Sequence, residues 1–222
     1  MATQNASRKG YIVGQSNATF STARTTVGTG SATDNPTASD ATAVQFFDGR
    51  AANRFSRVYA HFDTSGITGT VSSVTLTING GSSSTTPDLI VIKSGAFGGD
   101  GGTALATTDF YANLDYSTAY SLEHTTTWGT GANAISLNSA AEADIKDDDD
   151  FTVALINHDA DFSNTDLGST ETNTIDFSTH FVLTYTEAAA GYTHDVNSVA
   201  AASISKVNSV ATASIGKINS VD

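Results

Sequence analysis

The sequence predicts an all-β fold: a jelly-roll-like, two-sheet β-sandwich that carries a short C-terminal repeat appendage. Between residues 11 and 186, short runs of β-branched and aromatic residues alternate with clusters of Gly, Asn, Asp and Ser. This is the pattern of strands separated by turns, and about eight such runs favour a sandwich of two sheets. The last 28 residues follow a different rule, because one phrase recurs there every eleven positions.

The strand assignments follow from the spacing of the apolar residues. Residues 74–78 alternate between apolar and polar side chains, and a turn that tolerates a positive φ follows at Asn79-Gly80-Gly81. Residues 89–92 form a continuous apolar run, and residues 151–156 and 181–185 are of a similar kind. Such runs are typical of strands buried in a core, so each predicts one core strand.

Residues 57–62 alternate in a way that predicts two different faces. Apolar and small side chains occupy the even positions, while Arg57, Tyr59 and His61 occupy the odd positions. Because successive side chains of a strand point to opposite sides of the sheet, we expect one core face and one polar face.

Residues 139–146 are the only stretch inside the domain that predicts a helical turn, because alanines dominate it. Four acids follow at Asp147–Asp150, and they oppose the negative end of a helix dipole. We therefore expect only a short helix or a loop, followed by a solvated acidic loop.

The composition limits the classes of partner. The 222 residues include 10 basic and 23 acidic ones, and the net charge of -13 repels phosphate backbones and anionic membrane surfaces. Charged residues make up 15% of the chain, against roughly 25% in ordinary soluble domains. Neutral polar surfaces of this kind are typical of secreted, fibrous and virion proteins. We expect neither nucleic acid as a partner nor membrane insertion.

The chain contains no cysteine, which excludes disulfides, thiolate zinc sites and cysteine nucleophiles. Residues 1–10 lack the apolar run of a signal peptide, and no apolar span of 18 residues occurs elsewhere. The surface composition is that of a protein exposed outside the cell, yet no export signal is seen. This combination favours a virion component, which is made in the host cytoplasm and exposed on the particle.

Changes in pattern along the chain predict four segments. We expect an N-terminal arm at residues 1–10 and the sandwich at residues 11–186. An alanine-rich linker follows at residues 187–194, and the eleven-residue repeats occupy residues 195–222.

The repeat consists of three copies of one phrase, at Asp195–Val199, Lys206–Val210 and Lys217–Val221. An eleven-residue period is compatible with a helical seam, whereas its Asn-Ser pairs and many Val and Ile residues favour turns and β structure. A flexible tail lying over a partner is a further alternative. A unit this short cannot bury its own apolar face, so we expect it to oligomerise the chain, with a trimer as the first expectation, or to anchor it. The residues expected to make these contacts are Val196, Val199, Ile204, Val207, Val210, Ile215, Ile218 and Val221.

Residues 203–211 resemble the Ile-x-Lys-Val-Asn-Gly-Val repeats that close many structural proteins of tailed phages, particularly marine ones. Ser198, Ser209 and Ser220 stand in the place of the usual glycine. Separately, Arg57–Asp63, followed by Val74–Ile78 and later by Ile135–Asn138, resembles jelly-roll modules of surface and carbohydrate-associated proteins. The first resemblance implies a phage structural protein, and the second implies a fold without an activity.

Aspartates supply the candidate metal ligands. Asp147–Asp150 with Asp144 has the oxygen ligands that Ca²⁺ takes, but a solvated loop is the favoured interpretation. Asp159, Asp161 and Asp166, with His158 alongside, are further weak candidates. The alternate spacing of Asp159 and Asp161 places two carboxylates on one side of an extended segment, which is the better geometry for an ion. No metal and no other cofactor is expected overall.

Trp128, together with Tyr111, Tyr116 and Tyr120, is a candidate platform for stacking sugar rings. The favoured interpretation makes Trp128 a core anchor of the sandwich. The platform carries the alternative function, which is a glycan-binding module for host-surface recognition or adhesion.

No catalytic site is expected. The five histidines lack a metal-ligand spacing, and His61 with Asp63 and Ser65 matches a triad only in composition. Gly98–Gly102 lacks the Lys and Ser or Thr of a phosphate loop. A polysaccharide hydrolase would need a pair of carboxylates in a cleft, which spacing in the sequence cannot show. The sequence therefore favours a non-enzymatic virion structural protein, either a capsid decoration or a tail-fibre part, with itself and phage capsid or tail proteins as partners.

Overall fold

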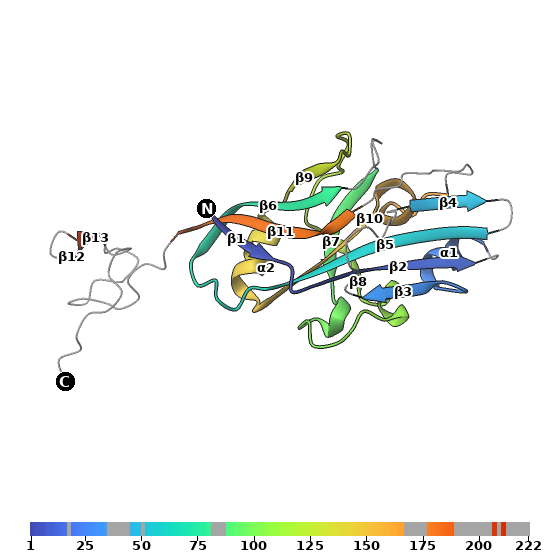
Figure 1. Ribbon diagram of the computed structural model, residues 1–222, viewed down its shortest axis with the longest axis horizontal. Helices are drawn as coiled ribbons and strands as arrows, with labels where there is room; N and C mark the ends of the chain where they lie inside the picture. Colours follow the sequence, from blue (N-terminus) through green and yellow to red (C-terminus); the bar gives the residue numbers. More distant parts are fainter. Residues whose placement is uncertain are drawn as a thin grey trace.

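The computed structural model describes residues 1–16, 19–34, 45–49, 52–80, 88–166, 177–188, 206–207 and 210–211. Two antiparallel sheets pack face to face in an elongated sandwich (Figure 1). The prediction of an all-β sandwich is confirmed.

The smaller sheet has four strands. In order across the sheet they are β1 (Ala2–Asn5), β11 (Phe177–Ala188), β6 (Thr70–Gly80) and β9 (Gly131–Ser136). The larger sheet has seven. Six of them run in the order β3 (Ser31–Asp34), β2 (Arg8–Ser16), β5 (Ala52–Asp63), β10 (Asp150–Asn157), β7 (Leu89–Ser94) and β8 (Leu114–Ala119). The seventh, β4 (Gln45–Gly49), pairs with the first half of β5.

The connectivity of these strands is that of a jelly roll. Strand β1 pairs with β11, β5 with β10, β6 with β9, and β7 with β8, so the pairs are nested along the chain. The nested pairs are divided between the two sheets, which is how eight strands wind into this fold. The β2 and β3 pair and β4 extend the larger sheet beyond these eight strands.

Short helices cover the ends and the outer face of the sandwich. They are α1 (Phe20–Thr25), α2 (Ser139–Asp147), the 3-10 turns η1 (Ala96–Gly98) and η2 (Thr107–Phe110), and the π-helical turn η3 (His158–Phe162). Helix α2 confirms the helix expected at residues 139–146, and the Asn138 side chain caps it by accepting hydrogen bonds from the backbone of Ala140 and Ala141. None of the helices in the described part of the chain is long and apolar enough to cross a membrane.

The main core lies between the two sheets and is apolar. Val74, Leu76 and Ile78 alternate inward from β6, as the sequence pattern predicts, and they meet residues of β5 and β10 such as Val58 and Leu155. The side chain of Trp128 is fully buried in the same cluster, so its expected role as a core anchor is confirmed.

The expectation of a polar outer face on β5 is wrong. Arg57, Tyr59 and His61 are buried, because η1, η2, α1 and η3 cover that side of the larger sheet. A second apolar cluster forms beneath this cover, and it includes Phe55 and Tyr59. The larger sheet is therefore buried on both faces. On its second face the buried charge of Arg57 has to be paired inside the protein.

The expected N-terminal arm at residues 1–10 is also wrong. Ala2–Asn5 pairs with β11 in register with Tyr185 to Val182, and β2 already begins at Arg8. The backbone N–H and C=O groups along the edge of β11 need hydrogen-bond partners, and residues 2–5 supply them. At the other boundary, β11 continues to Ala188, where Glu187 accepts hydrogen bonds from the N–H groups of Thr68 and Gly69. Glu187 and Ala188, predicted as the start of the linker, therefore belong to β11. The rest of the predicted linker, residues 189–194, lies outside the described residues.

Four residues of the middle repeat copy are described. They form β12 (Lys206–Val207) and β13 (Val210–Ala211), which pair antiparallel with Val207 opposite Val210. These four described residues are extended, which favours the β alternative over the helical seam for this part of the repeat. The other residues expected to mediate assembly lie outside the described residues: Val196, Val199, Ile204, Ile215, Ile218 and Val221.

Candidate functional site

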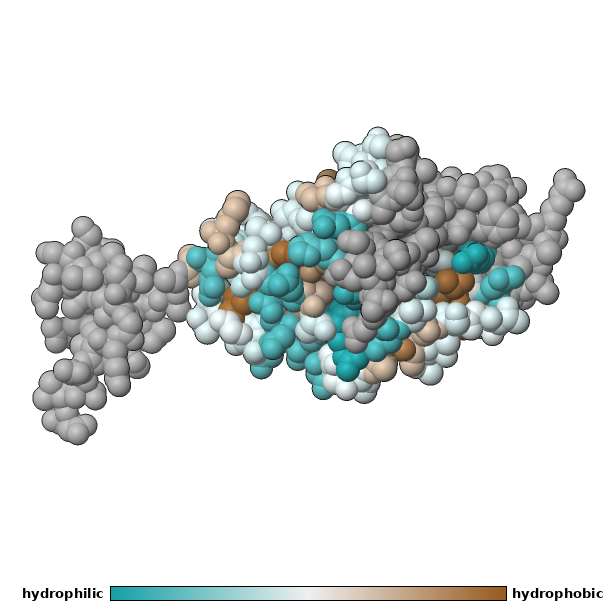
Figure 2. All heavy atoms as spheres, viewed as in Figure 1, coloured by the Kyte–Doolittle hydropathy of each residue, from teal (hydrophilic) through white to brown (hydrophobic). Residues whose placement is uncertain are grey.

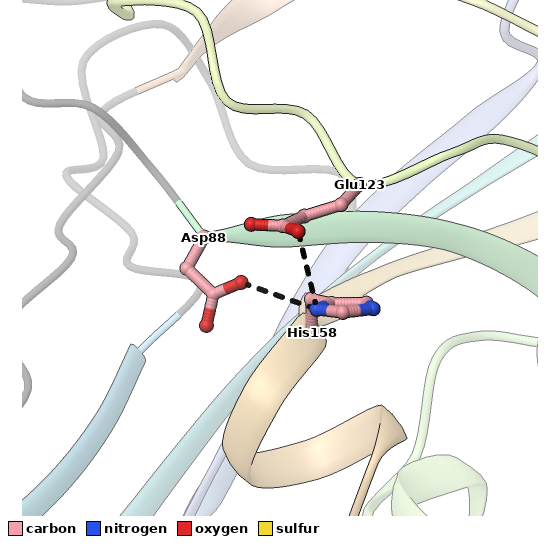
Figure 3. A group of neighbouring side chains, drawn as sticks. All are labelled: Asp88, Glu123 and His158. Atoms are coloured by element: carbon pink, nitrogen blue, oxygen red, sulfur yellow. Dashed lines mark ion pairs between the residues drawn. The ribbon is translucent and has the colours of Figure 1, made fainter.

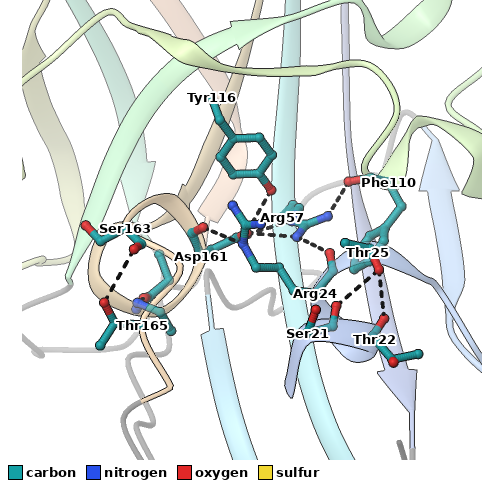
Figure 4. A network of polar contacts seen from close by, with 12 residues as sticks. Ser21, Thr22, Arg24, Thr25, Arg57, Phe110, Tyr116, Asp161, Ser163 and Thr165 are labelled. Atoms are coloured by element: carbon teal, nitrogen blue, oxygen red, sulfur yellow. Dashed lines mark hydrogen bonds and ion pairs between the residues drawn. The ribbon is translucent and has the colours of Figure 1, made fainter. Parts of the chain in front are cut away.

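A buried ion pair organises the outer face of the larger sheet (Figure 4). Both Asp161 oxygens accept from Arg57, at 2.6 Å from Nε and 2.8 Å from Nη2. The hydroxyl of Tyr116 donates to Asp161 Oδ1 at 2.8 Å, and Arg24 Nε lies 3.3 Å from that oxygen. The exposure of the Arg57 and Asp161 side chains is 0% and 1%. The positive charge of Arg57 and the negative charge of Asp161 therefore neutralise each other inside the protein.

The remaining donors of Arg57 fasten separate segments of the cover. Its Nη2 donates to the backbone oxygen of Arg24 at 2.7 Å, and its Nη1 donates to that of Phe110, whose ring lies 3.9 Å from the guanidinium carbon. Burial lowers the pKa of Arg57, but the charge of Asp161, the neighbouring Tyr116 and the hydrogen bonds to Asp161 together outweigh it, so the pKa lies above its ordinary value. Arg57 stays charged and links β5 to α1, η2 and η3.

The weak candidate ligands Asp159, Asp161 and Asp166 do not form a metal site together. Asp161 is a buried ion-pair partner whose oxygens already accept from Arg57 and Tyr116, which leaves no room for a cation. Asp159 and Asp166 are exposed. The π-helical turn η3 breaks the extended geometry on which the alternate spacing argument depended.

The four expected platform aromatics do not share a surface. Trp128 and Tyr120 are buried, and Tyr120 donates its hydroxyl to Asp144. Tyr111 and Tyr116 are half-buried with ring centroids 5.5 Å apart, and the Arg24 guanidinium lies 4.2 Å from the ring centroid of Tyr116. The platform is therefore corrected: two of its members belong to the main core and two belong to the cover of the outer face.

An acidic hollow of about 530 Å³ opens beside α2 and the start of β10. Asp147, Asp148 and Asp149 are exposed along it, as expected for a solvated acidic loop, and Asp150 begins β10. Lys93 Nζ lies 2.8 Å from Asp144 Oδ2, and this hydrogen bond raises the pKa of Lys93. The lysine thereby neutralises part of the negative charge at this end of the sandwich.

A neighbouring hollow of about 370 Å³ contains a serine, a histidine and an aspartate in one chain of hydrogen bonds. His61 Nδ1 lies 2.5 Å from the Ser7 hydroxyl oxygen, and His61 Nε2 lies 3.1 Å from Asp150 Oδ1. The combination of His61 with Asp63 and Ser65 that matched a triad in composition does not form, because Ser65 donates to Asp63 instead.

The surroundings of this chain of hydrogen bonds favour a structural role. Ser7 lies where the chain crosses from β1 in one sheet to β2 in the other, and its N–H donates to the backbone oxygen of His61 at 2.8 Å. Acyl transfer would need N–H donors free to stabilise an oxyanion. The N–H groups of Ser7 and of nearby Gly102 are already bonded, the latter to Asp100. The contact thus fastens the crossing between the sheets.

A third polar group, which sequence reasoning missed, consists of Asp88, Glu123 and His158 (Figure 3). One ligand-type atom from each residue lies within 4.8 Å of the other two. His158 Nδ1 is 3.7 Å from Asp88 Oδ1 and 3.6 Å from Glu123 Oε2. These residues are far apart in the sequence and show no motif, so only the pairing of strand ends could have revealed them.

Comparison with known proteins gives no family for this chain. No protein-family model matches it, and no curated protein matches it either.

Proposed function

We propose that this protein is a non-enzymatic structural component of a tailed-phage virion. In this proposal the jelly-roll sandwich is displayed on the exterior of the particle, as a capsid decoration or part of a tail fibre. The C-terminal repeats oligomerise the chain and hold it to phage capsid or tail proteins.

The virion part of the proposal rests on the resemblance of residues 203–211 to phage repeats, and the observation that carries the assembly part is the hairpin in the middle repeat copy. Val207 pairs with Val210 and Lys206 with Ala211, so the strands are two residues long and two residues separate them. An isolated two-stranded hairpin is at best marginally stable in water, and strands this short add little. Since the phrase recurs in register on both sides, several copies must stack, either within the chain or between chains, to complete a core.

The surface of the sandwich supports the proposal that the sandwich is displayed and that the repeats attach it. Among the described residues, Met1 and Leu122 are the exposed large apolar side chains. Figure 2 shows hydrophilic and neutral residues predominating on the coloured part of one face, with apolar residues as separate spots. Stable interfaces usually need a larger apolar centre. The attachment function therefore falls to the repeats.

The fold agrees with this proposal without deciding it. Double-sheet jelly rolls occur in viral capsid domains and in lectins, and one fold serves many functions. The glycan-binding alternative has lost its aromatic platform, because Trp128 and Tyr120 are buried. No other described feature favours glycan recognition over assembly.

The test compares the molar mass of two forms by light scattering after size-exclusion chromatography. One form is the full chain, and the other ends at Gly191, so that all of β11 and the contacts of Glu187 are retained. We expect an oligomer for the full chain and a folded monomer for the truncated form.

A full-length variant with Val207→Ser and Val210→Ser provides the matched comparison, because it keeps the chain length and alters one apolar pair of the hairpin. It should lose mass toward the monomer while its circular dichroism stays that of the sandwich. An oligomer that persists after truncation would assign self-association to the sandwich and refute this role of the repeats.

A further inference from the structure

We infer that Asp88, Glu123 and His158 bind one divalent transition-metal ion, for which Zn²⁺ is the best fit. The site would join three segments at one end of the larger sheet. It is separate from the repeats and from the buried Arg57 and Asp161 pair.

Backbone pairing fixes the positions of the three residues. Asp88 immediately precedes β7, and its backbone oxygen accepts from the N–H of His158 at 3.2 Å, just after β10 ends. On the other side of β7, Leu89 bridges to His124, whose N–H donates to the Leu89 oxygen at 2.8 Å. Glu123 thus comes from a segment held next to β7. The three side chains converge because their backbones are already paired, which is the preorganisation that a metal site needs.

The distances suit a small ion. A tetrahedral ion with bonds of roughly 2.0–2.2 Å holds its ligand atoms about 3.3–3.6 Å apart. His158 Nδ1 is 3.7 Å from Asp88 Oδ1 and 3.6 Å from Glu123 Oε2. Both distances from Nδ1 are thus close to the spacing of two ligand atoms on one ion, and the two carboxylate oxygens lie within 4.8 Å of each other.

One oxygen in the group lacks a partner that the fold would otherwise supply. Asp88 Oδ1 is shielded from solvent and accepts no hydrogen bond from the described residues. The other oxygen, Oδ2, accepts from the N–H of Asp159 at 3.0 Å, which fixes the carboxylate with Oδ1 toward His158. A buried oxygen left unpaired costs free energy, and a bound cation would remove that cost.

The local charge also calls for a cation. His158 Nδ1 is hydrogen-bonded to Asp159 Oδ1 at 2.9 Å and also faces the carboxylates of Asp88 and Glu123, so a metal ion would take the place of this hydrogen bond. Within the described residues, neither Asp88 nor Glu123 forms an ion pair with a lysine or arginine. Burial, aided by the neighbouring carboxylates, raises the pKa of Asp88. A divalent ion would neutralise this excess of negative charge.

The ligand types select the metal. Ca²⁺ prefers an all-oxygen shell, whereas one imidazole nitrogen with two carboxylates suits Zn²⁺.

The His158 ring stacks on Phe162 with centroids 6.0 Å apart, and Asn157 caps the turn by accepting from the N–H of Ala160. The side chain of Glu123 is 39% exposed, so water can reach a fourth position on the ion.

The test is a titration of the full-length, chelator-treated protein with Zn²⁺ in a calorimeter. We expect binding of one ion per chain. His158→Gln should weaken this binding by roughly 100-fold or more, because ligand loss exceeds the 10–100-fold cost of losing an outer contact. Glu123→Gln should also weaken it, and its partly exposed side chain makes this variant the safeguard against misfolding.

His180→Gln is the matched control, since His180 is exposed on β11 and takes no part in the group. It should bind Zn²⁺ as the unaltered protein does, and Ca²⁺ should not compete. The thermal midpoint should rise with Zn²⁺ in the unaltered protein and the control, but not in His158→Gln. The inference is overturned if no ion binds stoichiometrically, or if both ligand variants bind Zn²⁺ as tightly as the unaltered protein.

Discussion

The sandwich and the described part of the repeats differ in how many apolar residues each can bury by itself. The sandwich encloses one apolar cluster between its two sheets and a second beneath its outer cover. The described part of the repeats is one hairpin with two residues in each strand, which is too small to enclose a core. The described sandwich therefore buries its apolar residues within one chain, whereas in our proposal the repeats bury theirs by stacking on one another.

This difference separates two measurable quantities. Damage to the sandwich should lower the free energy of unfolding and leave the molar mass of the assembly unchanged until the domain unfolds. Damage to the repeats should change the molar mass and leave the unfolding of the domain unchanged.

The largest effect is expected at the buried ion pair. Asp161→Ala leaves Arg57 charged and unpaired in the interior, which should cost about 3–5 kcal/mol of unfolding free energy. Urea denaturation measures this cost, and light scattering checks that the folded fraction keeps its mass. Asp147→Ala removes an exposed partner of Lys146 and should cost less than about 1 kcal/mol. Equal costs for the two variants would contradict the assignment of Asp161 to a buried pair.

A somewhat smaller loss is expected between the sheets. Leu76 is fully buried on β6, so Leu76→Ala should lower the unfolding free energy by roughly 2–5 kcal/mol through lost burial and a residual cavity. Thr75→Ala on the other face of the same strand should cost less than about 1 kcal/mol. A change in the mass of the assembly with Leu76→Ala, at temperatures where it stays folded, would tie the core to self-association.

Loss of the α2 cap is expected to be milder. Asn138→Ala removes the acceptor for the N–H groups of Ala140 and Ala141, together with the hydrogen bond that the Asn138 amide donates to the Ala119 oxygen, and should cost about 1–2 kcal/mol. Ser139→Ala, at the exposed first residue of the helix, is the comparison and should be close to neutral. Thermal or urea unfolding of the two variants side by side measures the difference, and no difference would show that the cap contributes nothing.

The smallest effect concerns the pH response of one exposed carboxyl. Hydrogen bonds from the hydroxyl and N–H of Ser65 lower the pKa of Asp63 below its ordinary value. Because the folded pKa lies below the unfolded one, this contribution is present above the unfolded pKa and is lost as the pH falls through the folded one. Ser65→Ala should raise the pKa of Asp63, as followed by NMR. An unchanged pKa would exclude these bonds as its cause.

Local pattern was sufficient to predict the strands that carry most of the core. The alternation at residues 74–78 and the apolar runs at 89–92 and 151–156 all belong to β6, β7 and β10. Alanine content and the acids that follow also placed α2 within one residue of its observed end. In each case the signal and its structural cause lie within a few residues of each other.

The features that the sequence did not predict depend on partners far along the chain. Arg57 looked like a surface residue because its partner, Asp161, lies 104 positions away. Residues 2–5 looked like an arm because their polar side chains do not show that the backbone pairs with β11. Asp88, Glu123 and His158 share no spacing, and only the alignment of strand ends brings them together.

The central claim is that the repeats alone are sufficient for self-association. The most direct measurement fuses residues 189–222 to an unrelated monomeric fluorescent protein and determines the molar mass by light scattering. The same fusion with Val207→Ser and Val210→Ser is the control. The account predicts an oligomer, with a trimer as the first expectation, and a shift toward monomer in the control. A fusion that remains monomeric at every concentration tested would contradict it.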